Sequence, residues 1–211
     1  GDYGISTNVY AYTALILVLL TFGMETTLFR FANDDPSTLN SQHPTIKSLW
    51  PDTVFSTAFA TVGTLTLAFI VLLFGFITPI SNYLGYADHP DYLLMMGVVV
   101  ALDALQALPF SYLRFQKRPI RFASLKLLFI MLNIGLNVFY FVVLGKTSVY
   151  YVFLINLLCT AFIMLLFVPE FFRIRWHFDG RLLRRMLGYS WPILILGIAG
   201  ILNQVADKIL F

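Results

Sequence analysis

Ionisable and amide side chains interrupt the long apolar runs of this chain, and these are the residues that could do chemistry. Asp103 lies in the middle of the run 92–115, and Gln106 follows three residues later on the same helix face. Lipid surroundings disfavour a charged carboxylate, so this group is suited to take up and release a proton. Asp103 and Gln106 are therefore candidates for ion coupling. The alternative is a structural role, in which the Asp103 carboxyl hydrogen-bonds to a neighbouring helix.

Two further charges lie in the first apolar run, 5–31. Glu25 and Arg30 are five residues apart, which is about 140° around a helix, so we do not expect them to pair with each other. Each needs another partner or water. Arg30 could instead extend its side chain to the lipid headgroups. We predict that Glu25 and Arg30 line a polar path.

The last run, 189–211, places small residues before polar ones. Its stripe of small and polar residues indicates a helix that another helix approaches closely and that then opens onto a polar cavity. The alternative is that the polar residues meet water at the membrane surface. We predict three cavity residues here: Gln204, Asp207 and Lys208.

No pattern typical of an enzyme is present. The sequence lacks GxSxG, HExxH and CxxC motifs and a phosphate-binding loop, and its three histidines fall in separate connecting segments. We expect a protein that is not an enzyme, with no catalytic residue, no metal and no cofactor.

Uncharged polar residues recur at helical spacing inside other runs. Four threonines, at 53, 57, 61 and 64, share one face of the run 53–80. Asn133, Asn137 and Tyr140 share a face of the run 120–144. Asn156 and Thr160 are placed similarly. We expect these residues to hydrogen-bond between helices.

The composition determines which elements position these residues. The chain is 59% hydrophobic and 12% charged, with a mean hydropathy of +0.80, as is typical of an integral membrane protein. Runs of about twenty apolar residues indicate spanning helices, whereas barrels show short alternating strands. We predict an all-α, multi-span helical bundle with these runs: 5–31, 53–80, 92–115, 120–144, 149–168 and 189–211.

The positive charges predict the topology. Twelve of the fourteen Lys and Arg residues fall in the gaps after the first, third and fifth runs or in the ends of the runs that border these gaps. By the positive-inside rule these gaps are cytoplasmic, so the net charge of +3 reflects membrane orientation and we expect no nucleic-acid partner. Gly1 then lies outside, and we expect a further span before it.

The densest basic segment suggests a division of the chain. Residues 181–188 alternate arginines with Leu and Met, as is typical of an amphipathic helix on the inner membrane face. We predict a first lobe of five spans over 1–169, a cytoplasmic amphipathic linker over 170–188, and the truncated first helix of a second lobe over 189–211.

Three segments together resemble bacterial lipid-linked oligosaccharide flippases and polysaccharide exporters, within the multidrug/oligosaccharidyl-lipid/polysaccharide superfamily: residues 3–12, residues 22–31, and 188–200 with Asn203 and Asp207. The resemblance implies two lobes of six helices and alternating access through a central cavity. It assigns the runs 5–31 and 189–211 to that cavity. Arg30 would attract a pyrophosphate, and Glu25, Asp207 and Lys208 would line the path.

We therefore expect a flippase for a polyprenyl-pyrophosphate-linked oligosaccharide in the bacterial inner membrane, serving surface polysaccharide synthesis beside a polymerase and glycosyltransferases. Its other partners would be membrane lipids and H⁺ or Na⁺, coupled through Asp103 or Glu25. One alternative is a cation-coupled multidrug exporter, for which acidic residues and aromatic side chains would suit cationic drugs. Another is a membrane-embedded glycan polymerase or acyltransferase.

Overall fold

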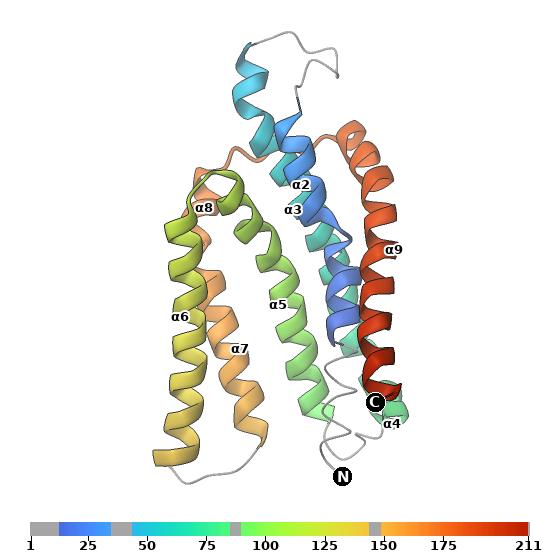
Figure 1. The fold of residues 1–211 in the computed structure, drawn as a ribbon, viewed down its shortest axis with the longest axis vertical. Helices are drawn as coiled ribbons and strands as arrows, with labels where there is room; N and C mark the ends of the chain where they lie inside the picture. Colours follow the sequence, from blue (N-terminus) through green and yellow to red (C-terminus); the bar gives the residue numbers. More distant parts are fainter. Residues whose placement is uncertain (1–12, 35–43, 85–89, 144–148, 211) are drawn as a thin grey trace.

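The computed structural model describes residues 13–34, 44–84, 90–143 and 149–210, which contain helices and no strand. A helix over residues 13–21 comes first (Figure 1). The elements after it are α2 (Met24–Asn33), α3 (Pro44–Gly75), α4 (Ile77–Leu84), α5 (Pro90–Phe115), α6 (Pro119–Val138), the π-helix η2 (Phe139–Val143), α7 (Val149–Leu166), α8 (Val168–Arg173) and α9 (Gly180–Leu210).

Six stretches of the described chain are long and apolar enough to cross a membrane. They are Thr13–Asn33, Trp50–Gly75, Asp91–Phe115, Pro119–Val142, Tyr150–Arg173 and Gly180–Asn203. Each overlaps one of the predicted runs, which confirms the all-α, multi-span bundle. Two runs are divided where they were expected to be continuous: the first at Phe22 and Gly23, and the second where α3 ends at Gly75 and α4 begins at Ile77.

The last helix begins earlier than predicted. The Asp179 carboxylate accepts hydrogen bonds from the backbone N–H groups of Arg181 (2.8 Å) and Leu182 (3.2 Å), and this cap starts α9 at Gly180. Residues 181–188 are thus helical, as expected, but they continue directly into the span. That 170–188 joins two lobes stays a prediction.

The basic residues gather at one end of the bundle. Figure 1 shows α2 and α5 ending, and α6 and α9 beginning, at its upper end, while α4 lies at the lower end. Arg30, Arg114 and Arg173 belong to the last turns of α2, α5 and α8 respectively. The spans therefore run alternately up and down, so that the basic gaps lie at one end of the bundle, as the charge pattern predicted.

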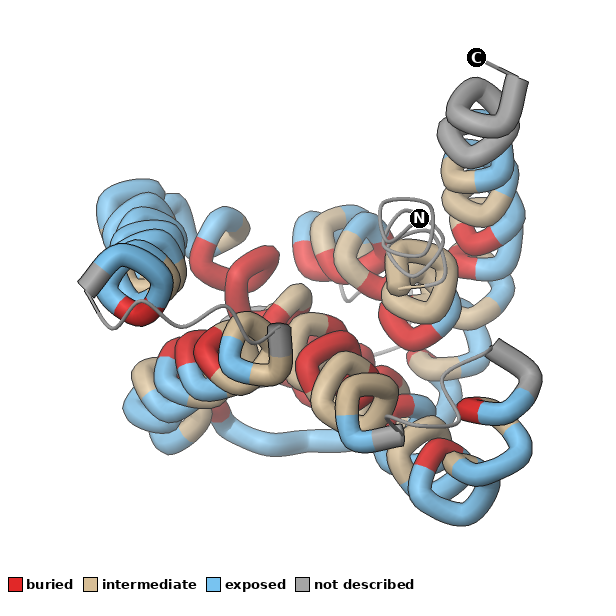
Figure 2. Tube along the Cα trace, turned by 90° about the horizontal axis from the view of Figure 1, so that it is seen from below, coloured by how far each residue is buried: buried red, intermediate tan, exposed pale blue. Residues whose placement is uncertain are grey.

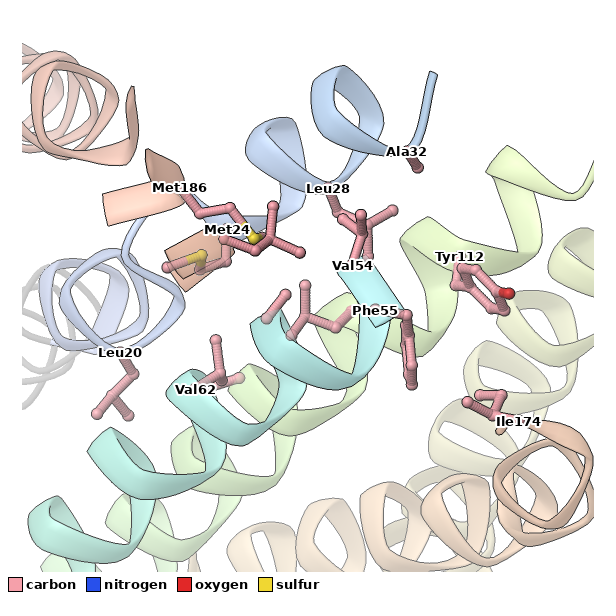
Figure 3. Packing of buried hydrophobic residues seen from close by; sticks show 14 of the residues in the cluster. Leu20, Met24, Leu28, Ala32, Val54, Phe55, Val62, Tyr112, Ile174 and Met186 are labelled. Carbon is pink, nitrogen blue, oxygen red and sulfur yellow. The ribbon is translucent and has the colours of Figure 1, made fainter. Parts of the chain in front are cut away.

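The main apolar core joins helices from both ends of the sequence. Met24 and Leu28 of α2, Val54 of α3 and Met186 of α9 are fully buried in one cluster, which Figure 3 shows together with Tyr112 of α5. By contrast α6, at the left of Figure 2, is exposed along most of its length, as suits a helix surrounded by lipid.

One of the expected polar contacts between helices joins α6 and α7. The Asn133 Nδ2 group donates to Asn156 Oδ1 across α6 and α7 at 3.1 Å, which confirms that prediction for this pair. It was wrong for Thr61 and Thr64, whose hydroxyls donate to the carbonyl oxygens of Thr57 and Ala60 in their own helix. It was also wrong for Asn137, whose amide donates to the carbonyl oxygen of Asn133 at 2.8 Å, because hydroxyl and amide side chains can both bond to the preceding turn of their own helix.

A left-handed turn breaks the first span. Phe22 and Gly23 have φ angles of 49° and 65° between the helix over 13–21 and α2. A Cβ atom on Gly23 would lie 2.8 Å from Ile193 Cγ2 in α9. This position therefore needs glycine for two reasons, its backbone conformation and the close approach of α9.

Gly23→Ala should destabilise the protein by at least about 1 kcal/mol, because alanine disfavours the left-handed region and its methyl group would displace Ile193. Gly63→Ala is the matched control, since no heavy atom lies within 4 Å of its added Cβ and alanine favours the helix. Thermal unfolding in detergent measures both. Equal stability of the two variants would contradict this account of the turn.

Cysteine accessibility tests the orientation. The native Cys159 is 2% exposed and can be replaced by alanine, whereas Asn33 at the end of α2 and Asn82 in α4 are both exposed. A membrane-impermeant maleimide added to intact bacteria expressing the protein should modify N82C and spare N33C, because the basic end faces the cytoplasm. Both should react after lysis. Labelling of N33C alone would reverse the orientation.

Candidate functional site

Glu25 does not pair with Arg30 but with a residue of α5. Its Oε2 atom lies 3.5 Å from the Arg114 guanidinium and accepts a hydrogen bond of 3.0 Å from the Ser111 hydroxyl. The Arg114 guanidinium in turn donates to Ser111 Oγ at 3.0 Å. Glu25, Ser111 and Arg114 therefore form one connected cluster between the beginning of α2 and the end of α5.

Glu25 and Arg114 line an open pocket of about 400 Å³, together with Phe29. The side chains of Arg114 and Glu25 are 47% and 40% exposed, so a ligand can reach both. The Phe29 ring of α2 and the Phe122 ring of α6 each lie 5.5 Å from the Arg114 guanidinium carbon. The remaining lining comes from the turn and first residues of α2: Thr21, Gly23 and Thr26. We call this cavity the Arg114 pocket.

Arg30 lies on another side of α2 and contacts α9. Its guanidinium carbon is 4.4 Å above the centre of the Tyr189 ring, an arrangement that stabilises a cation without cancelling its charge. Close by, the hydroxyls of Thr27 and Ser190 share a hydrogen bond of 2.6 Å, and both residues are fully buried. The first and last predicted runs are thus in direct contact, while Glu25 and Arg30 face different neighbours.

Asp103 and Gln106 have different surroundings on α5. The Gln106 amide is buried and donates to the carbonyl oxygen of Thr160 in α7 at 2.6 Å, so it ties two helices together. Asp103 is half-buried. The structure therefore gives Gln106 a structural partner on α7, and Asp103 stays a candidate for ion coupling.

The three predicted residues of the last run belong to the final turns of α9. The helix includes Gln204, Asp207 and Lys208, whose side chains lie outside the described residues. Their assignment to the cavity stays a prediction.

Three contacts at the basic end of the bundle were not expected from the sequence. The Tyr112 hydroxyl donates to Asp52 Oδ1, and Asp52 Oδ2 accepts from the backbone N–H of Arg175 at 3.4 Å. Arg121 forms an ion pair of 2.8 Å with the buried Glu170 of α8. The first two contacts join α3 to α5 and to the segment that leads to α9, and the third joins α6 to α8.

From the sequence, Arg114 was only one of the basic residues that indicate the membrane topology, and its place in a pocket was not predicted. The spacing of Ser111 and Arg114, three residues apart on one helix face, was the available signal. It does not identify Glu25 as the partner, because that carboxylate comes from a distant part of the chain.

A family model described as "Polysaccharide biosynthesis protein" matches residues 1–211. No curated protein and no solved structure matches the chain. The match covers the full length and agrees with the spans, the basic end of the bundle and the resemblance to polysaccharide exporters noted in the sequence. The chain therefore belongs to the polysaccharide biosynthesis protein family.

Proposed function

We propose that this protein is a transporter that moves a polyprenyl-diphosphate-linked oligosaccharide across the bacterial inner membrane for surface polysaccharide synthesis. The observation that carries the proposal is the Arg114 pocket. It presents an exposed guanidinium at the basic end of a membrane-spanning bundle, in a protein of a polysaccharide biosynthesis family. A lipid-linked sugar made in the cytoplasm would arrive at this end.

The chemistry of the pocket suits a diphosphate. A guanidinium offers a planar fork of donors that binds phosphate oxygens in pairs, and the bond is stronger than one between neutral groups. The buried Ser111 hydroxyl accepts a hydrogen bond from Arg114 and so helps to hold the guanidinium in place. The sugar would extend away from the diphosphate, and the polyprenyl chain would remain in lipid beside the exposed apolar faces.

In alternating access the substrate would first meet the contact between the first span and α9. Arg30 stacks on Tyr189 at this contact and keeps an exposed cation near the cytoplasmic end. It would attract the diphosphate before the substrate reaches Arg114. Transport of this kind needs binding and movement but no covalent step, and a polymerase and glycosyltransferases would act before and after it.

Arg114→Gln should lower transport by about ten- to a hundredfold, because it removes one charge-assisted contact to the diphosphate. The assay is flipping of a lipid-linked oligosaccharide in proteoliposomes, with restoration of surface polysaccharide in cells as a second measurement. Arg184→Gln is the matched control, since it removes an exposed charge near the same end of the bundle.

The same proteoliposomes test the multidrug alternative. Uptake of a lipophilic cation, with no movement of the lipid-linked sugar, would favour a drug exporter over the proposed flippase. Equal transport by Arg114→Gln and Arg184→Gln would show that the pocket does not bind the diphosphate.

Asp103→Asn should abolish the acceleration of transport by an imposed H⁺ or Na⁺ gradient, since a neutral amide can neither take up and release a proton nor neutralise a bound Na⁺. Asp91→Asn, the same substitution at the beginning of the same helix, should retain the acceleration. The ratio of rates with and without the gradient is the measurement. An Asp103→Asn protein that responds like the wild type would remove Asp103 from the coupling mechanism.

A further inference from the structure

The arginine that would bind the substrate already has an anionic partner. Glu25 contacts Arg114 through one oxygen at 3.5 Å, which is long for an ion pair, and the two side chains are 40% and 47% exposed. Exposed pairs of this kind are weak and open to competition by other ions. A dianionic group that approaches Arg114 therefore competes with a single carboxylate whose contact with the guanidinium is long.

Arg114 keeps its position without Glu25. Ser111, on the same helix, accepts its hydrogen bond at 3.0 Å, and the Phe29 and Phe122 rings lie 5.5 Å from the guanidinium carbon. Three contacts thus hold the cation, and only one of them comes from α2. Loss of the carboxylate leaves the guanidinium in place and its outer donors free.

Glu25 cannot remain where it is once a diphosphate binds. The incoming oxygens would lie within a few ångströms of the Glu25 carboxylate, and like charges at such distances repel strongly in a partly apolar site. The pocket holds about 400 Å³, many times the volume of a water molecule, so the carboxylate has room to turn away.

We propose that Glu25 is a resident counter-ion of Arg114 that the diphosphate of the substrate displaces. The inference rests on the proposed function and adds a specific role for Glu25. Binding replaces the Glu25–Arg114 pair by a diphosphate–Arg114 pair, and so removes the ionic contact between α2 and α5. Return of the carboxylate to Arg114 then helps to expel the product.

The contact of α2 with α9 does not take part in this exchange. Thr27 and Ser190 remain joined by their buried hydrogen bond, and Met24 and Met186 remain packed in the core. Substrate binding thus removes the ionic contact on one side of α2, while the hydrogen bond to the last helix on the opposite side remains.

The test is the affinity of the purified full chain for farnesyl diphosphate, a short polyprenyl diphosphate, measured by calorimetry in detergent. Glu25→Gln keeps the size of the side chain and can still accept the Ser111 hydrogen bond, but it removes the competing charge. It should bind the probe about three- to tenfold more tightly than the wild type. Glu25→Asp retains the charge on a shorter side chain and should give a smaller increase.

Asp34→Asn is the matched control, because it removes an exposed negative charge beyond the other end of α2. Its affinity should equal that of the wild type. Arg114→Gln should bind weakly, and adding Glu25→Gln to it should change nothing further. Inorganic pyrophosphate should show the same order of affinities if the diphosphate alone is recognised, and farnesol should not bind.

The outcomes separate this inference from the proposed function. If Arg114→Gln weakens binding while Glu25→Gln leaves it unchanged, the diphosphate site stands and the counter-ion role is wrong. An equal gain in Asp34→Asn would also overturn the role, since general charge would then explain the effect. If the wild type and Glu25→Gln both fail to bind the probe, both ideas are wrong.

Discussion

The contact of α2 with α9 is the constraint on which the candidate site depends. The left-handed turn at Phe22 and Gly23 interrupts the first span, and the missing side chain of Gly23 lets Ile193 approach. The new helix then begins with Met24 and Thr27 facing α9 and the core. With that face fixed, Glu25 can only point toward α5 and Arg30 only toward Tyr189. One turn thus decides which partner each charged residue of α2 meets.

Much of the fold could be predicted because the membrane imposes simple rules. Spans must be long and apolar, and basic residues gather on one side, so all six stretches and their alternation follow from hydropathy and charge. The errors occur where local chemistry overrides the general pattern. The Asp179 cap starts α9 at Gly180, and α3 ends at Gly75 although the apolar run continues. Hydropathy is the same with or without the cap and the break, so a prediction from hydropathy could not locate either of them.

The site was harder to predict because its contacts join distant parts of the chain. Spacing on a helix correctly excluded a pair between Glu25 and Arg30, yet it could not name their partners. Glu25 lies in the first span and Arg114 at the end of the third. A basic residue at the end of α5 is equally typical of one that only follows the positive-inside rule. Asn133 and Asn156 were easier, because consecutive antiparallel helices bring residues at equal depth together. Predictability in this chain therefore falls as the contacting residues lie farther apart in sequence.

The two polar contacts of α2 differ in a way that bears on movement. The Thr27–Ser190 hydrogen bond is short, uncharged and fully buried, and neither water nor a ligand can replace it without opening the core. The Glu25–Arg114 pair is longer, charged and half-exposed, so an anion from solution can replace one partner at little cost. A helix held by a permanent contact on one side and an exchangeable one on the other can respond to a ligand without losing its packing. The exchangeable contact is also the one that lines the Arg114 pocket, where an anionic substrate would arrive.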